Sequence, residues 1–248
     1  SGTRSRLAFV AAPDAPDGDR IFLGVDADGP YFAVLGALPE VPNARPASLR
    51  EVGEVLDDHH AALLAEAVGV ANWHRSYRYS PATGAPLVWQ AAGWEGVPAD
   101  DSAVVWPRTN PAVIVLVHDG VPGEGGRCLL TRAASWEPGR YSCVAGFVEP
   151  GESAEAAVGR EVREETAVLV RDVRYVASQP WPLPASLMLG FYALADAGQE
   201  VVVDHTELED ARWFTRAELR GRGPGPAPLH PSAFSISHEL IVGWRDAD

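Results

Sequence analysis

The stretch GFVEPGESAEAAVGREVREETAV, residues 146–168, decides how this chain is interpreted. Pro150-Gly151 favours a turn, Ser153 is a good N-cap, and the residues after it suit a helix that ends near Thr166. Three glutamates in this helix are spaced i, i+3 and i+4, so their carboxylates share one face within a single turn. They are Glu161, Glu164 and Glu165.

The three carboxylates have two interpretations. A solvated acidic helix face is common in an acidic protein, although like charges at these spacings destabilise a helix by roughly 0.2–0.5 kcal/mol per pair. A hard divalent cation removes that repulsion, because Mg²⁺ and Mn²⁺ prefer oxygen ligands and pair with diphosphate substrates. The three glutamates alone leave both interpretations open.

The complete stretch resembles the Nudix box, and this resemblance favours the metal site. The matching residues are Gly146, Glu152, Arg160, Glu161, Val162, Glu164, Glu165 and Val168. One departure is Ala167, which stands where the family has a Gly at the helix end and is expected to strain a left-handed cap. The resemblance implies an α/β protein with the Nudix fold, a mixed-sheet α/β/α sandwich.

The resemblance also implies roles for individual residues. Glu161, Glu164 and Glu165 are expected to hold Mg²⁺ or Mn²⁺, and Arg160 is expected to pair with Glu152 to brace the preceding loop. Ala145, next to the box, and Glu207, in the downstream acidic segment, complete the expected metal set. Family members attack a diphosphate phosphorus with water that the metal and a carboxylate activate.

A second segment, SQPWPLPASLM at residues 178–188, resembles the signature of the NADH pyrophosphatase branch of the family. Three prolines in five positions stiffen the backbone and are expected to hold Gln179 and Trp181 at a pocket wall. Ser186 closes the signature and is assigned to substrate binding, while Leu183 replaces the branch's Phe. The alternative is a rigid loop that packs Trp181 into the core.

Further matches to this branch flank the box. By the resemblance, Phe147 stacks on a substrate ring and Trp106, in place of the branch's Tyr, completes the sandwich from the partner subunit of a homodimer. Stacking of this kind contributes about 0.5–1.5 kcal/mol beyond burial. Ser237, at the start of a helix near the end of the chain, is also expected to contact substrate.

The implied reaction is hydrolysis of NAD(H) to NMN(H) and AMP, with removal of NAD caps from RNA 5′ ends as an accompanying activity. One alternative is cleavage of another diphosphate such as ADP-ribose or a nucleotide sugar, against which the proline-rich segment argues. Another is a non-catalytic NAD-sensing domain, against which the retained box carboxylates argue. The order among NADH, NAD⁺ and capped RNA stays open.

The branch typically carries two Cys-x-x-Cys pairs between its domains, and this chain lacks both. The matching stretch, residues 79–84, is YSPATG, and a structural zinc site needs four such ligands. We therefore expect no structural zinc, and a ribbon-like connection packed by Trp89 and Trp94. The two cysteines, Cys128 and Cys143, are expected to be buried thiols in a reducing cytoplasm.

Composition and charge limit the partners. The 248 residues include 34 acidic and 20 basic groups, a net charge of −14, which disfavours extended nucleic-acid contacts but allows a small anion to bind through a metal. No apolar run approaches the roughly 18 residues of a membrane span. The start, SGTR, has no initiator Met or apolar signal core, and we interpret it as a trimmed or engineered terminus.

Hydrophobic periodicity predicts three parts. Residues 1–75 are expected to form a small α+β domain, with strands at 21–25 and 31–35 and a helix at 58–74. Residues 76–105 are expected to be an irregular connection. Residues 106–248 are expected to form the Nudix domain, with helices at 153–166 and 235–244 and strands at 112–118, 127–132, 173–177, 187–194 and 212–214.

Overall fold

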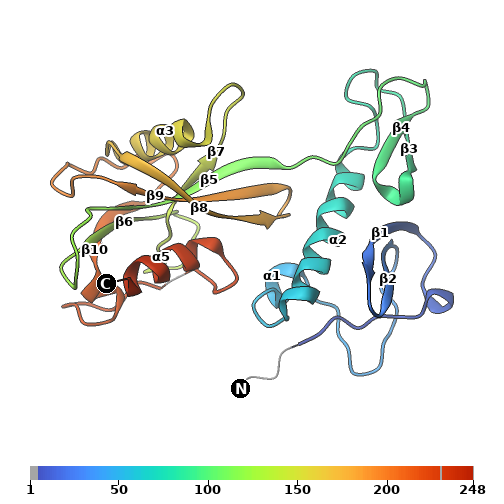
Figure 1. Ribbon diagram of the computed structural model, residues 1–248, viewed down its shortest axis with the longest axis horizontal. Helices are drawn as coiled ribbons and strands as arrows, with labels where there is room; N and C mark the ends of the chain where they lie inside the picture. The colour runs from blue at the N-terminus through green and yellow to red at the C-terminus, as the bar shows by residue number, and fades with distance from the viewer. Residues whose placement is uncertain (1–4, 230, 248) are drawn as a thin grey trace. The chain divides into compact units, whose positions relative to one another are not determined.

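The computed structural model describes residues 5–229 and 231–247 (Figure 1). The chain divides into two compact units, Ser1–Thr109 with Trp181–Ser186, and Asn110–Pro180 with Leu187–Asp248. The segment predicted as a separate connection therefore belongs to the first unit. So does the centre of the proline-rich segment, although the strands on both sides of it belong to the second.

The first unit is built on one hairpin and one long helix. The strands β1 (Asp19–Asp26) and β2 (Gly29–Leu35) pair antiparallel, and the short helices η1 (Ala12–Asp14) and α1 (Leu49–Val52) flank them in sequence. The helix α2 (Asp58–Ser76) begins where the Asp57 side chain accepts a hydrogen bond from the His60 backbone N–H. These elements confirm the predicted small α+β arrangement.

A second hairpin follows α2. The expectation of irregular structure over residues 76–105 is wrong for its two strands, whereas the expected ribbon-like connection packed by Trp89 and Trp94 is present. The strands β3 (Leu87–Gln90) and β4 (Glu95–Pro98) pair antiparallel around η2 (Ala91–Gly93). Two tryptophans attach this hairpin to the rest of the unit. Trp89 stacks on His74 with ring centroids 3.8 Å apart, and Trp94 Nε1 donates to the Phe22 carbonyl at 2.7 Å.

The second unit contains a six-stranded sheet. The strand order is β10-β6-β5-β9-β8, with β7 also paired to β5. The pairs β10–β6, β6–β5 and β5–β7 are antiparallel. The strands are β5 (Asn110–His118), β6 (Arg127–Arg132), β7 (Val144–Phe147), β8 (Arg171–Trp181), β9 (Ser186–Leu194) and β10 (Asp210–Thr215).

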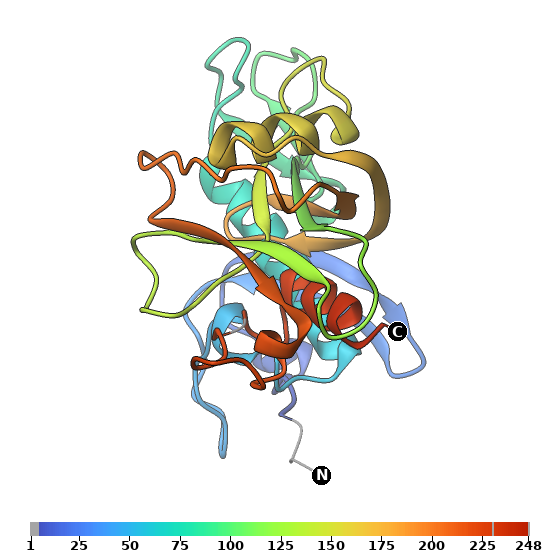
Figure 2. The same cartoon turned by 90° about the vertical axis from the view of Figure 1, so that its left-hand side faces the viewer.

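Helices cover both faces of this sheet. Along β5, Val113 and Val115 pack into one core cluster with residues of α3 (Ala154–Thr166), while Ile114 and Leu116 pack into another with residues of α5 (Ile236–Asp246). Successive strand residues face opposite sides, so a strand buried on both faces is apolar throughout. The two helices lie on opposite faces of the sheet (Figure 2), which confirms the α/β/α sandwich.

A last short helix, α4 (Arg216–Leu219), follows β10. Within residues 5–229 and 231–247, no helix has the length and apolar character needed to cross a membrane.

Candidate metal and substrate site

The box helix α3 has the predicted start and end. The Ser153 hydroxyl accepts a hydrogen bond from the Ala156 backbone N–H at 3.2 Å, as an N-cap does. Ala167 follows the last turn in the left-handed conformation, with φ 60°, and its N–H donates to the Arg163 carbonyl at 2.9 Å. The left-handed backbone at this position explains why the family has a Gly here. Ala adopts the same conformation at a cost in free energy.

Arg160 connects the box loop to the acidic face of α3. Its Nε and Nη2 donate to Glu152 at 3.0 and 2.9 Å, and Nη2 also donates to the Phe147 carbonyl at 2.8 Å. Its Nη1 donates to Glu161 at 2.8 Å and to Glu164 at 3.1 Å. Hydrogen bonding to this guanidinium lowers the pKa of Glu152 and, in return, raises the pKa of Arg160.

Gly146 provides the space that Glu161 occupies. A Cβ atom at position 146 would lie 1.9 Å from the Glu161 carboxyl carbon and 2.1 and 2.3 Å from its two oxygens. Real Cβ atoms do not approach other atoms this closely, so any larger residue at position 146 would have to displace the Glu161 carboxylate. The strand β7 and the helix α3 thus meet at the carboxylate expected to bind metal, which is 9% exposed.

Glu165 is the most deeply buried of the three helix carboxylates, at 6% exposed. Burial raises its pKa to about 8, and the negative charges of Glu161, Glu207 and Asp204 add to the effect. Burial also raises the pKa of Glu161, against the opposing influence of Arg160 and with a contribution from Glu207. Among the described residues no cationic side chain pairs with Glu165, so this end of the cluster lacks positive charge.

Two backbone contacts bring Glu207 to this cluster. The Val202 and Asp204 N–H groups donate to the carbonyls of Thr166 and Glu165, both at 3.0 Å. The Glu207 N–H then donates back to the Asp204 carbonyl at 3.2 Å. The loop that carries Glu207 is therefore attached to the end of α3 by backbone hydrogen bonds, which a local sequence pattern does not predict.

The donor set fits a hard divalent cation, since it consists of carboxylate oxygens, and the buried Glu165 has no cationic partner among the described residues. Ala145, the further position expected to contribute, lies in β7 directly before Gly146. Over the described ranges 5–229 and 231–247, however, no three acidic, His or Cys side chains converge closely enough to form a ready-made ligand cluster. Arg160 holds Glu161 and Glu164 in its hydrogen bonds, and these contacts would have to open for an ion to bind.

The two aromatic residues expected to sandwich a substrate ring are both on the surface. Phe147 is 57% exposed at the end of β7, and Trp106 is 58% exposed just before β5. Phe147 belongs to the second unit and Trp106 to the first. Large exposed rings of this kind are available for stacking.

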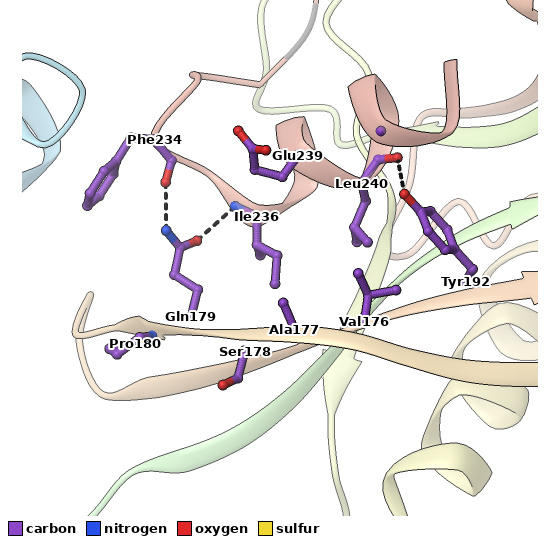
Figure 3. A pocket seen from close by; sticks show the side chains of 11 residues that line it. Val176, Ala177, Ser178, Gln179, Pro180, Tyr192, Phe234, Ile236, Glu239 and Leu240 are labelled. Carbon is purple, nitrogen blue, oxygen red and sulfur yellow. Dashed lines mark hydrogen bonds between the residues drawn. The ribbon is translucent and has the colours of Figure 1, made fainter. Parts of the chain in front are cut away.

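Gln179 lies at a pocket of about 500 Å³ between β8, β9 and α5 (Figure 3). Its amide nitrogen donates to the Phe234 carbonyl at 2.7 Å, and its amide oxygen accepts from the Ile236 N–H at 2.8 Å. Both ends of the amide are therefore engaged in attaching the start of α5 to β8. The pocket wall beside it is largely apolar, with Val176, Ile236 and Leu240.

The position of Ser237 differs from the expected one, in which its side chain faces the substrate. Its side chain is 1% exposed, its hydroxyl lies 2.7 Å from the Ser142 hydroxyl, and it accepts a hydrogen bond from the Cys143 N–H at 3.2 Å. These bonds attach α5 to the segment that leads into β7. The geometry gives Ser237 a bracing role inside the core.

The proline-rich segment is attached to α2 within the first unit. The Asn72 side-chain amide donates to the carbonyls of Pro182 and Pro184 at 2.8 and 2.9 Å. Trp181 and Ser186 bound the part of this segment that belongs to the first unit, and both are half-buried. Asn72 was not among the predicted site residues, and a lone Asn within a helix gives no sequence signal for this contact.

Comparison with known families assigns the class of protein. Residues 108–239 match the NUDIX domain, and residues 4–73 match the NADH pyrophosphatase-like rudimentary NUDIX domain. The chain therefore belongs to the Nudix hydrolase family, in its NADH pyrophosphatase-like branch. Membership of this family implies a general dependence on divalent metal.

Individual relatives are similar over most of the chain. It is 40% identical to the NAD-capped RNA hydrolase NudC of Mycobacterium bovis over 251 residues, covering 96% of this chain and 79% of the relative. It is also 40% identical to the human NAD-capped RNA hydrolase NUDT12 over 200 residues, which cover 76% of this chain and 42% of the relative. A NUDIX hydrolase structure from Nitrosomonas europaea shares the fold, with a TM-score of 0.50 and 18% identity. The match covers 68% of this chain and 90% of that structure's chain.

Proposed function

We propose that this protein hydrolyses the diphosphate of NAD(H) to NMN(H) and AMP, and that it removes NAD caps from RNA 5′ ends. The proposal rests on the group of carboxylates on α3, in which Glu161 and Glu165 are buried. Arg160 braces the loop before this helix, and the chain is 40% identical to an NAD-capped RNA hydrolase. In the reaction a water oxygen bonds to one phosphorus while the bridging P–O bond breaks. Two phosphate monoesters result.

We assign the metal ligands to Glu161, Glu164, Glu165 and Glu207, together with the backbone carbonyl of Ala145. Mg²⁺ or Mn²⁺ held by these residues would supply positive charge that offsets the diphosphate and would favour deprotonation of the attacking water. Arg160 keeps the box loop in place through Glu152 and the Phe147 carbonyl. The pairing supports a bracing role for Arg160 and Glu152 beside the metal ligands.

The proposed ring site uses Phe147. Its exposed face suits a planar nicotinamide or adenine, and we propose that Trp106 of the partner subunit covers the other side of the ring in a homodimer. Gln179, Trp181 and Ser186 belong to the stiff segment proposed to line the substrate pocket. Capped RNA would enter by its 5′ end alone, because a net charge of −14 opposes wider contact with the phosphate backbone.

The test is a substrate comparison with identified products. NADH, NAD⁺, ADP-ribose and NAD-capped RNA are incubated separately with the protein in Mg²⁺, Mn²⁺ or EDTA. We expect metal-dependent release of AMP from the dinucleotides and of 5′-monophosphate RNA from the capped RNA. Cleavage of ADP-ribose alone would reassign the substrate, and NAD binding without any cleavage would indicate a sensor.

A matched pair of variants separates the acidic cluster from the general acidity of α3. Glu165→Gln removes the buried carboxylate of the proposed site, whereas Glu155→Gln removes an exposed carboxylate from the first turn of the same helix. We expect the first variant to lose the metal-dependent activity and the second to keep it.

A further inference from the structure

A second pocket, of about 350 Å³, lies within the first unit where α2 ends beside β1, β2 and β3. Its polar lining comes from Asp19, His74, Arg75 and Arg78, and Trp89 forms part of its wall. None of these residues belongs to the proposed metal or substrate site. The volume is at the lower end of the range, roughly 300–1,000 Å³, that accommodates small molecules.

His74 lines this pocket and contains an unsatisfied acceptor. The residue is 4% exposed, its ring stacks on Trp89 at 3.8 Å, and its Nε2 lies 2.7 Å from the Gly93 carbonyl. A carbonyl only accepts hydrogen bonds, so Nε2 carries a proton, and in the tautomer with a single proton there the lone pair lies at Nδ1. That Nδ1 is buried and has no hydrogen-bond partner among the described residues, a costly arrangement unless a donor from outside the chain meets it.

The charged side chains around His74 are exposed, and no ion pair joins them to one another. Arg75 donates to the Asn72 side-chain oxygen, and neither Arg75 nor Arg78 pairs with a carboxylate among the described residues, in a chain whose net charge is −14. Asp19 likewise pairs with no cation there. The pocket thus holds two guanidinium donors that suit an anion, and two acceptors, Asp19 and His74 Nδ1, that suit hydroxyl groups.

We propose that this pocket binds a sugar phosphate, such as the ribose 5-phosphate part of a mononucleotide. The phosphate meets Arg75 and Arg78, and the sugar hydroxyls donate to Asp19 and to His74 Nδ1. An inorganic anion satisfies only the arginines and leaves both acceptors unpaired. The ligand chemistry is that of the products of the proposed reaction, but the site does not depend on that reaction.

The test is calorimetric titration of the full-length protein with ribose 5-phosphate in EDTA, with inorganic phosphate and ribose as partial ligands. We expect one site per chain and binding at least about tenfold tighter for ribose 5-phosphate than for either part. Arg78→Ala removes one charged donor, and His74→Gln keeps an amide donor for Gly93 while removing the Nδ1 acceptor. Each is expected to weaken binding about tenfold or more.

Arg50→Ala is the matched control, because Arg50 is an exposed arginine of the same unit outside the pocket. Its binding is expected to equal that of the wild type, and thermal melts establish that each variant is folded. If His74→Gln fails to fold, the binding measured for Arg78→Ala alone decides whether the pocket is the binding site.

Three results would overturn the proposal. They are the absence of saturable binding, phosphate binding as tightly as ribose 5-phosphate, and unchanged binding in folded Arg78→Ala. Binding that is lost in Glu165→Gln but kept in Arg78→Ala would assign the ligand to the metal site instead. NADH hydrolysis is measured separately, so loss of the proposed activity with intact sugar-phosphate binding would leave this site standing.

Discussion

At the scale of single residues, the contact between Gly146 and Glu161 couples the strand β7 to the proposed metal site. A side chain at position 146 must displace the Glu161 carboxylate, because the two would overlap at about 2 Å. A misplacement of about 1 Å in a catalytic group can cost up to a hundredfold in rate.

We therefore expect Gly146→Ala to lower kcat by about ten- to a hundredfold while the protein remains folded. Gly125→Ala is the control, because a Cβ atom there meets nothing within 4 Å. Steady-state kinetics with NADH at saturating metal provides the measurement. Equal rates for the two variants would show that Glu161 does not need its observed position.

Glu165→Gln is expected to lower the activity of the protein but to raise the stability of its metal-free form. Loss of the Glu165 carboxylate should lower kcat at least about a hundredfold, the scale of a lost transition-state electrostatic group. The same substitution should stabilise the metal-free protein at pH 8, because the buried carboxylate has no cationic partner among the described residues.

The sign follows from the raised pKa. From its ordinary value of 4.5 the pKa of Glu165 rises to about 8 in the folded state, so folding opposes ionisation. The destabilisation is absent below pH 4.5, grows as the pH rises, and is complete above about pH 8. Thermal melts in EDTA should therefore give the wild type and Glu165→Gln similar melting temperatures at pH 5. At pH 8 Glu165→Gln should melt at the higher temperature.

At the level of elements, α3 has a Gly where its backbone conformation favours Ala, and its C-cap has an Ala where the backbone favours Gly. Gly159 lies within the helix with open space around it, and Ala167 holds the left-handed cap with φ 60°. Gly weakens a helix interior, whereas it adopts the left-handed conformation without strain.

We expect Gly159→Ala and Ala167→Gly each to increase the free energy of unfolding by about 0.5–1 kcal/mol. Ala156→Gly, an exposed position in the same helix, should decrease it by a similar amount. Urea denaturation of the three variants is the measurement. Destabilisation by Ala167→Gly would contradict the cap geometry.

Elements with a strong local pattern were predictable from the sequence. The helix predicted at 153–166 is α3 with its N-cap at Ser153, and the strand predicted at 127–132 is β6. The hairpin β3–β4 was missed because four-residue strands among Pro, Gly and Trp carry too little periodicity. The buried role of Ser237 was missed because its partners, Ser142 and Cys143, lie more than 90 residues away in sequence.

At the scale of the whole molecule, the proposed homodimer completes each site with Trp106 of the partner subunit. Trp106→Ala and Glu165→Gln are then each defective alone but complementary when mixed. A heterodimer holds one site with both lesions and one with neither, and random exchange gives about half heterodimers, so activity should recover to roughly a quarter of the wild type.

Sedimentation first establishes the oligomeric state of the wild type and of the mixture. A monomer at working concentration would contradict the shared site. Verified heterodimers without activity would place Trp106 in the site of its own subunit.

In the proposed reaction, water attacks a phosphorus of NAD(H) and the diphosphate breaks. Hydrolysis of NADH in water enriched in oxygen-18, followed by mass spectrometry, locates the oxygen of the attacking water. This mechanism gives NMNH and AMP as products, with one heavy oxygen in the phosphate of only one of them, in Mg²⁺ or Mn²⁺ and not in EDTA. Release of nicotinamide with ADP-ribose, or products without the heavy oxygen in a phosphate, would contradict it.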